Sequence, residues 1–174
     1  LHAGVRYVDL TRAEWPTLQP HIGELANATG VIFDPEDIQP SVPENFSITC
    51  PATRFDRPGF KFLSSFILIR EIAGYDTERW TLPPENPQIT GEVAFLTNAG
   101  AISYAESIMG IVEHHDLGTI VGQPTAGANG GINPFKLPGH YTIYWTGMRV
   151  RKHDGSQHHL VSIRPDVPVE RTIE

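Results

Sequence analysis

Ser103 lies where a side-chain hydroxyl could serve as a nucleophile. Residues 92–97 are typical of a buried strand, and residues 102–115 have the apolar spacing of a helix. A strand, a tight turn and a helix in this order place the turn at the carboxyl edge of a sheet, where open α/β folds usually bind ligands. The N–H of Tyr104 would lie at the positive end of the helix dipole and could stabilise an oxyanion. The alternative is that Ser103 only caps the helix, since serine is favoured there.

Histidines are the candidates for the base that a serine nucleophile needs. Histidine is the residue type most often used as a general base, which makes His159 a candidate, and a solvated hairpin histidine is the alternative. A metal site would need His114, His115, His153 and the His158–His159 pair to converge, and they could do so only if the helix end meets the hairpin. Their spacing is not the i, i+4 pattern that puts two ligands on one helical face, so we predict no metal and no cofactor.

Asp34 is a further candidate, because it ends the apolar run 31–34 at the carboxyl edge of a predicted strand. Its carboxylate could position a substrate. The alternative is an ordinary turn-forming aspartate.

Two strand–helix–strand units are expected to position these residues, and they predict an α/β fold with a parallel sheet. In the first unit, Pro20 should kink the helix. The units comprise residues 4–10, 12–27 and 31–34, and then 92–97, 102–115 and 118–122. The inner face of the second helix is predicted from apolar residues at helical spacing, namely Ile102, Ala105, Ile108, Met109 and Val112.

The rest of the chain is less regular. Residues 35–59 predict a long surface excursion, residues 60–69 a strand or buried segment, and residues 75–91 an irregular connection. The last third alternates around Pro138-Gly139 and Asp154-Gly155, which predicts a region of antiparallel hairpins.

Composition limits the classes of protein. The 174 residues suit a single domain, residues 1–174, which we expect to be part of a longer chain because it lacks a starting Met. The net charge is -7 and basic residues are scattered, so nucleic acid is not expected as a partner. No apolar run approaches the roughly 20 residues of a membrane span. Cys50 is the only cysteine, which excludes an internal disulfide and a thiolate metal cluster.

Four segments occur in an order that resembles a known family: VAFLT (93–97), NAGAI (98–102), SYAE (103–106) and VGQPTAG (121–127). Together they resemble the catalytic core of the carboxyl-terminal processing, or tail-specific, serine proteases and their tricorn-like and retinoid-binding-protein relatives. The resemblance extends from residue 4 to residue 172. It implies a crotonase-like α/β core related to Clp proteases, with Ser103 as the nucleophile.

Departures from the family pattern concern the partners of Ser103. The processing branch has a lysine base at the position of Ala128, so the chain is more similar to the tricorn-like branch that lacks this lysine. In that branch the base is a histidine from a segment before the core, and His159 stands near the place of a supporting glutamate. The family's glycine loop is replaced by residues 35–38.

The resemblance implies a serine-type peptidase that acts on a peptide or protein. Tyr104, Gly127 and Asp34 are expected to bind the oxyanion or the substrate, and the base is either His159 or a histidine outside this chain. The alternative is a degenerate module that binds a peptide or apolar ligand without cleaving it. The sequence leaves open whether the protein forms a homo-oligomer. The family resemblance favours an extracytoplasmic location.

Overall fold

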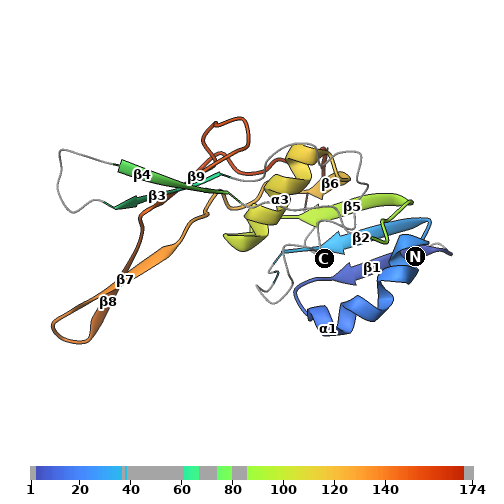
Figure 1. The fold of residues 1–174 in the computed structure, drawn as a ribbon, viewed down its shortest axis with the longest axis horizontal. Helices are drawn as coiled ribbons and strands as arrows, with labels where there is room; N and C mark the ends of the chain where they lie inside the picture. The colour runs from blue at the N-terminus through green and yellow to red at the C-terminus, as the bar shows by residue number, and fades with distance from the viewer. Residues whose placement is uncertain (1–2, 37, 39–60, 67–73, 80–85, 171–174) are drawn as a thin grey trace.

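A five-stranded parallel sheet forms the centre of the molecule (Figure 1). The computed structural model describes residues 3–36, 38, 61–66, 74–79 and 86–170. The strand order is β1-β2-β5-β6-β10, comprising Val5–Asp9, Gly30–Asp34, Glu92–Thr97, Thr119–Gly122 and Val167–Pro168. The prediction of an α/β fold with a parallel sheet is therefore confirmed.

The register of the central strands brings their large apolar side chains onto one face. Val31 lies opposite Val93, and Phe33 lies opposite Phe95, which in turn lies opposite Ile120. All five are at most 7% exposed, and the rings of Phe33 and Phe95 are 5.3 Å apart between centroids. Side chains alternate between faces along a strand, so this register builds the core from alternate positions.

The first crossover, between β1 and β2, is a broken helix. α1 (Trp15–Leu18) passes into a 3-10 turn (Gln19–His21) and then α2 (Ile22–Ala26). Pro20 lies in the 3-10 turn, as the missing N–H of proline would require. The predicted kink is confirmed, and the predicted helix over 12–27 is shorter and in three pieces.

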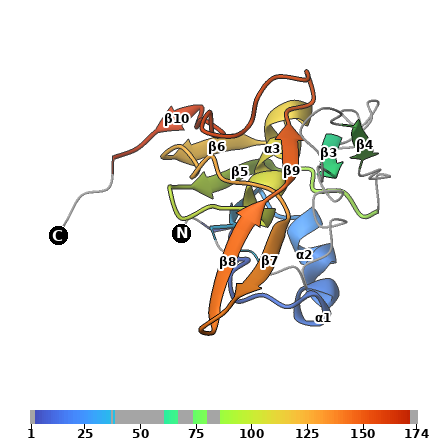
Figure 2. The ribbon, with the colours of Figure 1, turned by 90° about the vertical axis from the view of Figure 1, so that its left-hand side faces the viewer.

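The second crossover is α3 (Tyr104–His115), which lies on the same side of the sheet as α1 and α2 (Figure 2). Ala105, Ile108, Met109 and Val112 are buried, as their spacing predicts. Ile102 is 51% exposed, so its predicted place on the inner face is wrong. The reason is that the helix begins only at Tyr104, after a sharp bend at Ser103.

The antiparallel elements extend from this core. β4 (Gly74–Arg79), β3 (Lys61–Phe66) and β9 (Met148–Arg151) form one sheet. β7 (Ile132–Leu137) and β8 (Tyr141–Thr146) form a hairpin that projects from the body (Figure 1). The hairpin around Pro138-Gly139 is confirmed. β4 contradicts the prediction of an irregular connection over 75–91, because residues of mixed polarity here pair with β3.

Two further predictions have partial outcomes. The turn at Asp154-Gly155 forms, but beyond it only one isolated bridge, Arg151 to Gln157, continues the pairing, since β9 pairs with β3 instead. The predicted excursion over 35–59 lies outside the described residues except for positions 35, 36 and 38. In the described part of the chain, no helix is both long and apolar enough to cross a membrane.

Candidate active site

Ser103 has a backbone conformation that few residues other than glycine adopt. Its φ is 57° and its ψ is -109°. Ser103 is the N-cap residue of α3 by position, but its side chain makes no capping hydrogen bond, which contradicts the alternative that its hydroxyl only caps the helix. The conformation is held by its own N–H, which donates to the Ala128 carbonyl at 2.9 Å, and by its carbonyl, which accepts from Ser107 N–H at 3.1 Å. Strained residues of this kind cost about 1–3 kcal/mol each and cluster at active sites.

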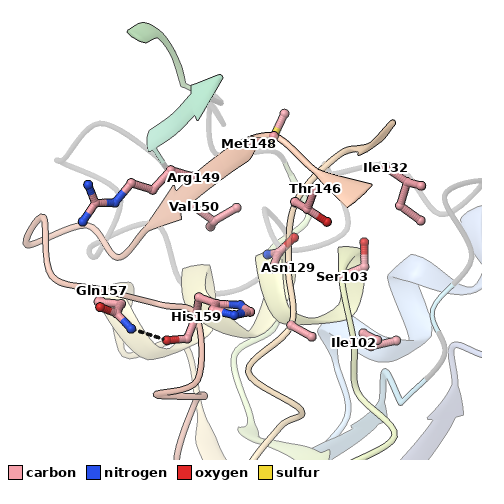
Figure 3. Close-up of a pocket in the computed structure, with 13 residues that line it drawn as sticks. Ile102, Ser103, Asn129, Ile132, Thr146, Met148, Arg149, Val150, Gln157 and His159 are labelled. Carbon is pink, nitrogen blue, oxygen red and sulfur yellow. Dashed lines mark hydrogen bonds between the residues drawn. The ribbon is translucent and has the colours of Figure 1, made fainter. Parts of the chain in front are cut away.

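A cavity of about 610 Å³ opens beside Ser103 (Figure 3). His159 lies on the opposite wall with its ring directed inward, and its carbonyl accepts from the Gln157 side-chain amide at 2.6 Å. Among the described residues, Ser103 and His159 share the cavity without a hydrogen bond between them. Asn129 and several apolar side chains complete the lining, notably Ile102, Ile132, Met148 and Val150.

A fully buried carboxylate lies behind Ser103, on the first turn of α3. Glu106 accepts from the Thr125 hydroxyl at 2.6 Å, from Gly127 N–H at 2.6 Å and from Ala128 N–H at 2.8 Å. Its other neighbour is the ring of His158, also fully buried, whose Nε2 lies 3.3 Å from Oε2. Glu106 therefore fixes the segment 125–128 against the helix that carries Ser103.

The electrostatics of Glu106 follow from these contacts. Burial by itself raises the pKa of a carboxyl group. Here hydrogen bonds from His158, Thr125 and Gly127 and the charge of His158 outweigh burial, and the pKa of Glu106 lies below its usual value. Glu106 is therefore a charged anchor at neutral pH.

Gly127 has a different place from the one predicted. Its N–H, the one group that could bind an oxyanion, donates to Glu106, and its carbonyl accepts from Leu160 N–H at 2.9 Å. Its φ of +68° and the approach of Ser162 Oγ and the Leu160 backbone explain why glycine is needed here. In this structure Gly127 supports Glu106, and its predicted contact with the oxyanion or the substrate stays a prediction.

Asp34 does not line the cavity either. Its carboxylate accepts from the Tyr7 hydroxyl at 2.6 Å, and this bond is the main cause that raises the pKa of Tyr7 to about 12. The structure thus gives Asp34 a contact between β2 and β1, and its contact with a substrate stays a prediction.

The segment that replaces the glycine loop reaches the turn before Ser103. The side-chain amide of Asn98 donates to the Glu36 carboxylate, and Asn98 Oδ1 accepts from Gly100 N–H at 2.6 Å. Tyr104 follows Ser103 as the first residue of α3, where the N–H groups of a helix point outward. The role of Tyr104 at an oxyanion stays a prediction.

Three of the five histidines considered as ligands come together away from this cavity. The end of α3 meets the turn after β9, and one ring nitrogen each of His114, His115 and His153 lies within 4.8 Å of the other two. His158 instead pairs with Glu106, and His159 lines the cavity. The sequence spacing did not predict this convergence.

Comparison with known proteins identifies the family of this chain. The model of peptidase family S41 matches residues 60–169, more than half of the chain. The chain belongs to peptidase family S41. No curated protein sequence matches it significantly.

Solved structures similar to this S41 chain share its fold at low sequence identity. A candidate peptidase from Parabacteroides merdae ATCC 43184 has a TM-score of 0.69 and 16% identity, covering 99% of this chain and 56% of its own. The photosystem II D1 C-terminal processing protease has a TM-score of 0.68 and 16% identity, covering 95% and 41%. Mature CPAF in complex with lactacystin has a TM-score of 0.66 and 15% identity, covering 94% and 47%. The chain thus spans about half the length of these structures.

The residues that support the site in this S41 chain were not predicted from the sequence. Glu106 ends the segment SYAE (103–106) and Thr125 lies in VGQPTAG (121–127), yet neither was assigned a role, and His158 was considered only as a metal ligand. The signal available was the spacing of Ser103 and Glu106, which puts Glu106 on the first turn of the helix that follows Ser103. Their partners become visible only when the three segments pack together.

Proposed function

We propose that this chain carries the nucleophile of a serine peptidase and hydrolyses peptide bonds. The observation that carries the proposal is the strained backbone of Ser103 at the wall of a cavity, with His159 on the facing wall. A helix cap would need no such strain, whereas a nucleophile raised on a sharp strand-to-helix bend does.

The chemistry follows from these positions. Ser103 Oγ forms a bond to the peptide carbonyl carbon while its proton passes to a histidine, and the N–H of Tyr104 stabilises the oxyanion. The C–N bond then breaks as the histidine returns the proton to the leaving amine. Water hydrolyses the acyl-enzyme by the same route and regenerates Ser103.

His159 is our choice for the base, and a histidine outside this chain is the alternative. The ring needs to move closer to Ser103, and catalytic hydrogen bonds are often long or absent before substrate binds. Ala128 stands where the processing branch has a lysine, which supports placing the chain with the tricorn-like branch.

The substrate we propose is a peptide or protein segment bound along the apolar cavity. The tail-specific mode of cleavage, the crotonase-like ancestry of the core and an extracytoplasmic location are proposed on family resemblance. We also propose that residues 1–174 form one core of a longer protein, in line with their coverage of 41% to 56% of the similar structures.

Fluorophosphonate labelling tests the proposal in the intact parent protein. Wild type should be labelled at Ser103, and Ser103→Ala should not be. His159→Gln should slow labelling by about 100-fold, in the range expected for loss of a general base. His21→Gln is the matched control, because His21 is an exposed histidine in the 3-10 turn.

Each outcome is decisive. A folded parent that is not labelled at Ser103 overturns the peptidase proposal and leaves a peptide- or apolar-ligand-binding module. Labelling of His159→Gln at the wild-type rate assigns the base to a histidine elsewhere.

A further inference from the structure

The histidine cluster defined by His114, His115 and His153 is the second concentration of potential chemistry in the described residues. His114 and His153 stack with ring centroids 3.8 Å apart and planes at 6°. The His115 ring lies edge-on to both, with centroids 4.7 Å and 5.6 Å away. Three imidazoles from two elements that are far apart in sequence therefore share one small volume.

We propose that the histidine cluster binds a divalent transition-metal ion of the zinc class. Imidazole is a preferred ligand of Zn²⁺, and three histidines with an open fourth position are an established donor set. Nitrogens bound to one zinc lie about 3.3 Å apart, given bonds of about 2.0–2.1 Å. The ligand atoms here lie within 4.8 Å of one another, so small side-chain rotations bring them to bonding distance.

The turn that carries His153 lies beside α3 through contacts that involve no metal. Lys152 Nζ contacts both oxygens of Glu113 at 2.9 Å, which ties the turn to α3. Within the turn, Gly155 N–H donates to the Lys152 carbonyl and Ser156 N–H to Asp154 Oδ1. These contacts, a partly exposed ion pair and hydrogen bonds within the turn, already place the two elements side by side, so a metal would not have to bring the ligands together from a distance.

Access and charge also suit a cation. A cavity of about 310 Å³ beside the cluster is lined by His114 and His153 together with Glu113, Lys152 and Asp154. The Glu113 carboxylate offsets the charge of Lys152, and Asp154 adds a negative charge at the exposed rim. Water or Asp154 would complete the coordination.

This site is separate from the proposed nucleophile. Ser103 and His115 lie at opposite ends of α3, roughly 18 Å apart at about 1.5 Å per residue. A bound metal would tie the end of α3 to the turn after β9. The Ser103 cavity instead involves β9 itself, which contributes Met148, Arg149 and Val150 to its lining. The metal acts as a tether between elements, and the inference does not depend on peptidase activity.

Titration of the full chain with Zn²⁺ by calorimetry tests the proposal. We expect one metal per chain and an affinity at least about 10- to 100-fold weaker in His153→Gln, since even an outer partner of a metal ligand is worth that much. His114→Gln should weaken binding similarly. Co²⁺ should give a visible absorption band in wild type that both variants lose, and Zn²⁺ should raise the melting temperature of wild type more than that of either variant.

Control variants locate the site. His21→Gln and His159→Gln should bind Zn²⁺ like wild type, because neither side chain belongs to the cluster. Absence of binding by wild type overturns the proposal. Binding that survives unchanged in both His153→Gln and His114→Gln also overturns it, and loss of binding in His159→Gln alone would move the metal to the Ser103 cavity.

Discussion

The two ends of α3 are both held by the last third of the chain, but by different kinds of contact. Near its start, Glu106 is fully buried and accepts hydrogen bonds from the segment 125–128. Near its end, Glu113 pairs with Lys152 in a contact whose side chains are 35% and 18% exposed. A glutamate thus belongs to a buried hydrogen-bond network at one end of α3 and to a partly solvent-exposed ion pair at the other.

The difference shows where this fold requires rigidity. A buried carboxylate must keep all its partners, because each unsatisfied buried group costs about 1–3 kcal/mol. A partly exposed ion pair is worth little and is easily replaced by water. The rigid end carries Ser103, and the adaptable end carries the histidine cluster.

Glu106→Ala should have the largest effect on stability. It leaves the Thr125 hydroxyl, two backbone N–H groups and the His158 ring without their acceptor, and removal of one partner from a buried ionic network costs about 3–5 kcal/mol. The free energy of unfolding, measured by urea denaturation, reports the loss. Glu113→Ala, on the same helix, is the matched control. Equal losses in the two variants would refute the contrast between the two ends.

The stabilisation provided by the Glu106 network should depend on pH in the acid range. The pKa of Glu106 is lower in the folded chain than its ordinary value of 4.5. Its contribution to stability is therefore complete above that value and is lost as the pH falls through the lower folded pKa. The stability difference between wild type and Glu106→Gln should shrink across this acid range. A difference that stays constant with pH would assign the effect to packing.

Ser103→Gly should be more stable than Ser103→Ala by about 1 kcal/mol or more, because glycine adopts a φ of 57° without strain. The comparison at Ser107, on the regular part of α3, should have the opposite sign, with Ser107→Gly less stable than Ser107→Ala by about 1 kcal/mol. Thermal unfolding of the four variants checks both. The same sign at both positions would mean that Ser103 is not strained.

Local patterns predicted the strand, bend and helix around Ser103, because buried strands and helical stripes are periodic within a short stretch. The pattern failed at Ile102, whose outward direction is set by the conformation of Ser103, and at residues 74–79, which become a strand by pairing with β3. Local patterns also could not reveal the contact of Glu106 with His158, because the two residues are 52 positions apart in the sequence. The histidine cluster is tertiary for the same reason: it exists because the turn after β9 packs against α3.

The smallest effect on stability is expected for the Glu113–Lys152 pair at the end of α3, and it tests directly whether the two ends of the helix differ. A double-mutant cycle of Glu113→Ala and Lys152→Ala should give a coupling of about 0.2–1 kcal/mol, because the pair is partly solvated and must order two flexible side chains. Added salt should reduce this coupling, since partly exposed charges are screened, while the cost of Glu106→Ala should hardly change. A coupling energy that does not change with salt would show that the Glu113–Lys152 pair is shielded from solvent as well as the Glu106 network is. The turn that carries His153 would then be fixed by the ion pair, and a tether made by metal would add little to it.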